Sequence, residues 1–205
     1  ALHRLFGRAP LLRDAAATYA LVSLARNALD AQFVNYANIR FGWSQQQTGP
    51  IMVVVGLMLA VAPQLLVPRL GLQRSILAGL LIFAAGLSGA GLSPSPGGFI
   101  GSIVVVSIGC VCIPALQAFL ANLAEPSERG AILGSLGSLT ELTGAIGSTL
   151  YASILASFTS ATPPLPLPGM HFFVGGAMLI VAWAVAARAF TEHADAARAA
   201  SRDVS

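Results

Sequence analysis

The sequence from Gly130 to Phe158 reads GAILGSLGSLTELTGAIGSTLYASILASF, and Glu141 is its only charged residue. On a helix, many of its Gly, Ser and Ala residues share a face with Glu141, whereas several Leu and Ile side chains point away. A face of small residues lets two helices approach closely. The stretch therefore predicts a membrane helix with a groove for a neighbouring helix. The predicted groove residues are Gly134, Gly137, Ser138, Gly144 and Ser148.

Glu141 lies at the centre of this predicted groove. A carboxyl group in such a place either exchanges protons with a transport pathway or, in its neutral form, donates a hydrogen bond to the neighbouring helix. The sequence leaves both roles open for Glu141.

The composition of the whole chain indicates an all-α membrane protein. Of 205 residues, 56% are hydrophobic and only 9% are charged, against about 25% charged in soluble domains. The charges lie between apolar segments instead of forming one patch, which argues against a nucleic-acid partner. Short connections join the apolar segments, so we expect one bundle over residues 15–189, after an N-terminal segment, 1–14, and before a polar tail, 190–205. The six predicted transmembrane helices are 15–39, 50–67, 75–92, 99–124, 130–158 and 170–189.

The arginines predict the orientation of this bundle. With a cytoplasmic N-terminus, the outer loops contain only Arg40, whereas nine arginines lie on or next to the cytoplasmic side. This asymmetry follows the positive-inside rule and predicts that both termini are cytoplasmic. The arginines expected in the cytoplasm are Arg4, Arg8, Arg13, Arg69, Arg74, Arg129, Arg188, Arg198 and Arg202.

The first predicted helix carries a polar stripe at membrane depth. Arg26 and Asp30 are one turn apart and can pair, which lowers the cost of inserting two charges, each about 3 kcal/mol. The pair either pins the helix to a neighbour or marks a substrate or ion pathway, and in both cases the stripe must face protein or water. The stripe consists of Tyr19, Ser23, Arg26, Asn27, Asp30 and Asn38.

The fourth predicted helix contains Pro114, which predicts a kink, and Gln117 on the same face as a candidate substrate contact. His171, at the outer end of the sixth helix, is expected to be a solvated interfacial residue. We find no nucleophile with a base, no phosphate loop and no set of metal ligands. The sequence therefore predicts neither an enzyme nor a cofactor.

Several loops resemble those of the major facilitator superfamily. PRLGLQR is similar to the second copy of its Gly/Arg-rich loop, with Arg69, Gly71 and Arg74 at matching places. FGWSQQQTG resembles the outer loop between the family's helices seven and eight. The run IPALQAFLANLAEPSERG is similar to tetracycline-resistance-like drug:proton antiporters, and its matching loop residues are Pro126, Glu128, Arg129 and Gly130.

This resemblance implies the C-terminal half of a twelve-helix transporter, with substrate in a cavity between two six-helix halves. It places the polar stripe and Gln117 at that cavity, and the Gly/Ser groove against the other half. The expected partners are membrane lipid, a small-molecule substrate and a second six-helix half. The expected function is secondary active transport of small organic solutes by alternating access, including proton-coupled efflux. The alternative is a non-transporting six-helix scaffold or subunit that binds a partner through the groove.

Overall fold

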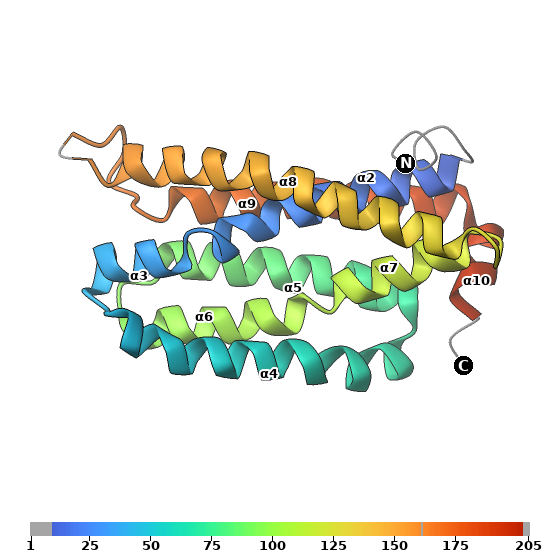
Figure 1. The fold of residues 1–205 in the computed structure, drawn as a ribbon, viewed down its shortest axis with the longest axis horizontal. Helices are drawn as coiled ribbons and strands as arrows, with labels where there is room; N and C mark the ends of the chain where they lie inside the picture. The colour runs from blue at the N-terminus through green and yellow to red at the C-terminus, as the bar shows by residue number, and fades with distance from the viewer. Residues whose placement is uncertain (1–9, 161, 203–205) are drawn as a thin grey trace.

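The computed structural model describes residues 10–160 and 162–202. This part of the chain forms helices and contains no strand. The long helices run side by side along one axis (Figure 1). In chain order they are α2 (Pro10–Asp30), α3 (Phe33–Phe41), α4 (Gln45–Leu70), α5 (Leu72–Leu92), α6 (Pro96–Gly109), α7 (Cys112–Asn122), α8 (Arg129–Phe158), α9 (Met170–Glu192) and α10 (Ala194–Arg202).

Four stretches of the described chain are long and apolar enough to cross a membrane: Gln46–Leu70, Leu72–Leu92, Pro96–Asn122 and Met170–Glu192. The two other predicted spans correspond to α2 with α3 and to α8, which also run along the bundle (Figure 1). Their polar and small residues lower their hydropathy, so six crossings stay a prediction. The start of α2 and the end of α10 lie at the same end of the bundle (Figure 1). We call this the terminal end; its position relative to the membrane also stays a prediction.

Two predicted spans are divided in the structure. The first is interrupted by a turn at Ala31 and Gln32, between α2 and α3. The fourth is interrupted at Cys110 and Val111, one turn before Pro114. Proline has no N–H to bond the carbonyl of Cys110 four residues earlier, and the Ile113 amide bonds that carbonyl instead, at 3.0 Å. The interruption lies where the sequence predicted a kink.

Glycine allows α5 to pack closely against the α6–α7 segment. A Cβ atom on Gly86 would lie 2.7 Å from the backbone nitrogen of Val106, and one on Gly79 would lie 2.8 Å from the carbonyl oxygen of Gly109. These separations are shorter than van der Waals contact, so a larger residue at either position would push the helices apart. The bundle therefore uses the small residues of its apolar helices for packing inside the chain.

The ends of the bundle differ from the sequence predictions in three places. Helix α2, which contains the first predicted span, already includes Pro10 instead of starting at residue 15, and the predicted polar tail contains a helix, α10, across the terminal end (Figure 1). The expectation that His171 is solvated was wrong: the side chain is fully buried, with its ring 5.2 Å from that of Tyr36. Neighbouring aromatic rings, including Phe172 at 4.0 Å, exclude water from it. Arg4 and Arg8 lie outside the described residues.

Candidate functional site

A polar cavity of about 240 Å³ lies between α2, α7 and α8. Most of the residues predicted for the pathway line it, although they come from two helices more than a hundred positions apart in the sequence. The cavity therefore joins the polar stripe of α2 to the carboxylate of α8. Its lining residues are Tyr19, Ser23, Arg26, Asn27, Asp30, Ile113, Thr140, Glu141 and Gly144.

The predicted ion pair is present in this cavity. The Nε atom of Arg26 lies 2.6 Å from Oδ2 of Asp30, one turn further along α2. The two side chains are 40% and 49% exposed, so the described chain leaves the pair partly uncovered. The Asn27 amide donates to the Ser23 carbonyl at 2.8 Å, which fixes that side chain along the same face. Charge and hydrogen-bonding groups are thus concentrated on one side of α2.

A chain of hydrogen bonds links three helices beside the cavity. The Nε2 atom of Gln117 on α7 donates to the Tyr19 hydroxyl at 2.9 Å. The Thr140 hydroxyl donates to the Leu136 carbonyl at 3.0 Å, so it accepts from Tyr19 at 3.1 Å. Tyr19 is 3% exposed, and both its donor and its acceptor are used. Gln117 therefore positions Tyr19 and is not itself among the lining residues.

The groove of α8 is open over much of its length. A Cβ atom on Gly134 or Gly137 would meet no atom of the described structure within 4 Å. Further along, a Cβ on Gly147 would lie 2.7 Å from that of Asn27, so α8 closes onto α2 there. Glu141 is exposed between these two regions. Ser138 and Ser148 are also exposed, so the bundle does not fill the groove predicted from the sequence.

Asn38, another predicted pathway residue, does not line the cavity between α2, α7 and α8. It lines a separate cavity of about 420 Å³ between α3 and α8, with Gln32, Asn35 and Trp43 among its neighbours. Its side-chain amide donates to the Trp43 carbonyl at 3.1 Å. The turn at Ala31 and Gln32 breaks the helical periodicity on which the prediction of one continuous stripe depended.

The loop motifs are at the terminal end of the bundle (Figure 1). Gly71 joins α4 to α5 with φ +77°, a conformation that suits glycine. Arg69 is in the last turn of α4 and Arg74 is in the first turn of α5. Pro126, Glu128, Arg129 and Gly130 form the connection from α7 into α8.

The sequence reasoning missed Thr140 and Ile113 as lining residues. Thr140 precedes Glu141 directly, and a hydroxyl beside a charged residue on an apolar helix is a usable signal. Ile113 carries no such signal, because it is one apolar residue among many. Within residues 10–160 and 162–202, no group of three His, Cys, Asp or Glu side chains could hold a metal ion.

Known proteins related in sequence are tetracycline resistance proteins. The chain is 27% identical over 155 residues to the class C protein of Escherichia coli, covering 74% of this chain and 38% of that protein. It is 24% identical over 178 residues to the class G protein of Vibrio anguillarum, covering 85% of this chain and 44% of that protein. The chain thus spans less than half the length of these curated relatives. No protein-family model matches it.

Solved transporter structures share the fold. The human organic anion transporter MFSD10 (TETRAN) superposes with a TM-score of 0.73 at 19% identity, over 85% of this chain and 40% of that one. A bacterial homolog of the human lysosomal transporter Spinster, inward-facing and unoccupied, superposes with a TM-score of 0.63 at 16% identity, over 97% of this chain and 50% of that one. In both cases about half of the larger protein is matched.

These matches show what the chain is similar to: it is an integral membrane protein that resembles major facilitator superfamily transporters in sequence and in fold. Within that class it resembles the tetracycline resistance proteins, and its length corresponds to part of such a protein. The resemblance stated from the loop motifs is confirmed.

Proposed function

We propose that the chain is the C-terminal six-helix half of a secondary transporter for small organic solutes, which moves substrate by alternating access together with a second six-helix half. Six crossings then place both ends of the chain in the cytoplasm, in accord with the distribution of arginine. The relatives named as resistance proteins and organic anion transporter support a role in transport.

One observation carries the proposal: the polar cavity opens at the surface of the bundle. The side chains of Arg26 and Asp30 are 40% and 49% exposed, and they lie near the middle of the segment formed by α2 and α3. Charged groups at membrane depth require protein or water around them, because lipid tails solvate them poorly. A second half that encloses an aqueous pathway supplies both, and substrate sites of such transporters lie near the bilayer midplane.

The lining residues suggest a division of roles. Arg26 and Asp30 set the charge at the substrate site, and Gln117 holds the Tyr19 hydroxyl towards Thr140. Glu141, on the other wall, is the candidate proton site for coupled efflux. The open groove around Gly137 then receives a helix of the second half.

Cysteine labelling tests whether the cavity contains water. We expect a membrane-impermeant maleimide to modify Asn27→Cys in membranes that contain the complete transporter. Ile180→Cys on α9 is the matched control, because this side chain is 48% exposed in the chain but is expected to face lipid. The native cysteines, Cys110 and Cys112, are buried and give a low background. Equal labelling of both variants would contradict the proposed pathway.

Transport in proteoliposomes tests the assigned roles. Arg26→Ala, Asp30→Asn and Glu141→Gln are expected to reduce solute flux singly and to abolish it together. Arg188→Ala removes a charge outside the cavity and should leave flux unchanged. Full transport by the triple variant would refute all three assignments.

The second candidate is a non-transporting six-helix subunit that binds a partner through the groove. It is favoured by the open space at Gly134 and Gly137, which the described chain leaves uncovered. Gly137→Leu should then weaken partner binding while transport activity is absent throughout. An unchanged oligomeric state in this variant would refute that alternative.

A further inference from the structure

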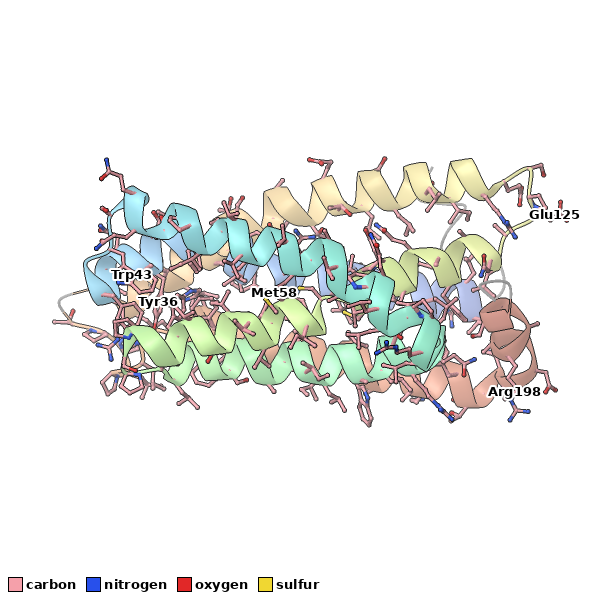
Figure 2. All side chains as sticks on the ribbon, turned by 90° about the horizontal axis from the view of Figure 1, so that it is seen from below. Tyr36, Trp43, Met58, Glu125 and Arg198 are labelled. Atoms are coloured by element: carbon pink, nitrogen blue, oxygen red, sulfur yellow. The ribbon has the colours of Figure 1, made fainter. Side chains whose placement is uncertain are left out.

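A third cavity, of about 260 Å³, lies at the terminal end, between the α4–α5 connection and α10. Two guanidinium groups from distant parts of the sequence line it: Arg74 in the first turn of α5 and Arg198 on α10. Figure 2 shows Arg198 at this end of the bundle, together with Glu125 and opposite Tyr36 and Trp43. The other lining residues are Leu70, Gly71, Leu72, Gln73 and Ser201.

The two arginines of this cavity have no counter-ion within the part of the chain that the structure describes. No Asp or Glu lines the cavity, and none occurs anywhere from Ala31 to Ala124, so α4 to α7 offer no carboxylate. Arg69, in the last turn of α4, adds a further positive charge nearby in the sequence. The cavity is therefore an anion-attracting site.

The acidic residues described at the terminal end do not line this cavity. Asp14 pairs with Arg13, Glu192 pairs with Arg188, and Glu125 and Glu128 line a different cavity. Asp195 is one turn before Arg198 on α10, but no ion pair joins them in the described structure.

The backbone adds donors to the same cavity. The first intrahelical acceptor of α5 is the Gly71 carbonyl, bonded by the Ser75 amide at 3.0 Å, and no side chain caps this terminus. The first-turn amides of Leu72 and Gln73 therefore lack helical acceptors, beside the two guanidinium groups.

The position of α10 is fixed by contacts with the bundle. The Asn122 side chain at the end of α7 donates to the Ala200 carbonyl at 2.9 Å. Ala197 and Ala200 are buried, at 0% and 5% exposure. Arg198, between them, is thus presented by a helix that is packed in place, and it lines the same cavity as Arg74.

We infer that this cavity binds a phosphate group, from an anionic phospholipid headgroup of the adjacent leaflet or from free phosphate. Guanidinium groups match the geometry of phosphate oxygens, and basic pockets between helices at the membrane edge bind lipid headgroups. The exposed apolar side chains of Leu65 and Leu70 on α4 continue from the cavity along the bundle and offer a surface for an acyl chain. This site is independent of the proposed transport function.

Native mass spectrometry of the full chain in detergent tests the site, with phosphatidylglycerol as the probe and diacylglycerol as the phosphate-free control lipid. We expect retention of one phosphatidylglycerol and none of the control lipid. Arg74→Gln and Arg198→Gln should each weaken binding roughly fivefold, and about thirtyfold together. Arg188→Gln, at the same end but outside the cavity, should bind as the unchanged chain does.

Two further arms distinguish the sources and check folding. If inorganic phosphate at millimolar concentration displaces the lipid and raises the melting temperature of lipid-free protein, the phosphate group alone is recognised. If it does neither, the site requires the phospholipid. Arg74→Lys, which keeps the charge, should retain more binding than Arg74→Gln at an equal melting temperature. Unchanged phosphatidylglycerol binding in a folded double Gln variant would overturn the inference.

Discussion

Replacing Asp30, which pairs with Arg26, should destabilise the protein more than replacing Glu192, which pairs with Arg188 at the same spacing on the surface. Asp30→Asn leaves the Arg26 guanidinium without its counter-ion in the middle of the bundle. A central arginine costs about 2.5–3.5 kcal/mol on membrane insertion, whereas an exposed i,i+4 pair contributes about 0.3–0.5 kcal/mol. The Arg26 Nε to Asp30 Oδ2 distance is 2.6 Å and the side chains are 40% and 49% exposed. We therefore expect a coupling energy between these limits, about 1–2 kcal/mol.

The chain contains its own control for this experiment. Arg188 and Glu192 have the same spacing and the same order along a helix, at 3.1 Å, with 79% and 53% exposure. Their coupling energy should be that of a surface pair, about 0.3–0.5 kcal/mol. The same assay therefore separates the effect of depth from the effect of geometry.

The assay is a double-mutant cycle on each pair, with unfolding followed by denaturant titration in bicelles. Arg26→Gln combined with Asp30→Asn should recover most of the loss seen with Asp30→Asn alone. A coupling energy for Arg26 and Asp30 no larger than that for Arg188 and Glu192 would refute the reasoning. Such a result would mean that bulk water solvates the cavity as well as it solvates the surface.

Three further changes test the packing. Gly86→Ala should lower the free energy of unfolding by about 1–3 kcal/mol, because α5 and α6 must separate to admit the methyl group. Gly101→Ala is the control: its Cβ atom has open space, so the free energy of unfolding should not fall. Chemical denaturation measures both variants. Tyr19→Phe should lower the free energy of unfolding by about 1–2 kcal/mol, because it leaves the Gln117 amide unpaired. The same denaturation assay measures it, and an unchanged denaturation midpoint would contradict the prediction. Gly147→Leu should force α8 away from α2 and lower the melting temperature, and an unaltered melting curve would show that α8 does not need this close approach.

The helical fold could be predicted from the sequence because the apolar stretches are long and their connections are short. The stretch from Gly130 to Phe158 is one helix, α8, as its pattern predicted. Arg26 and Asp30 were expected to pair because a spacing of four places them on one face, and they do. Local periodicity was sufficient for these features.

Other features depend on tertiary contacts that periodicity does not encode. The turn at Ala31 follows no proline or glycine, and it moves Asn38 into a different cavity from Asp30. His171 is buried beside the ring of Tyr36 on α3, more than a hundred positions away in the sequence, and no local pattern reveals this contact. The role of Gln117 in positioning Tyr19 could not be predicted either, because it depends on how close α7 lies to α2.

The distribution of charge separates two parts of this bundle. From Ala31 to Ala124 the sequence has no acidic residue, and over this range α5 and α6 pack through glycine. The charged groups that line the polar cavity, Arg26, Asp30 and Glu141, are on α2 and α8, and these helices meet where Gly147 contacts Asn27. A bundle that folded only for its own stability would cover Arg26, Asp30 and Glu141 with its remaining helices. Because it leaves them at an open face beside an unfilled groove, the stability of that face depends on whatever encloses it, and the transporter proposal assigns this task to a second half.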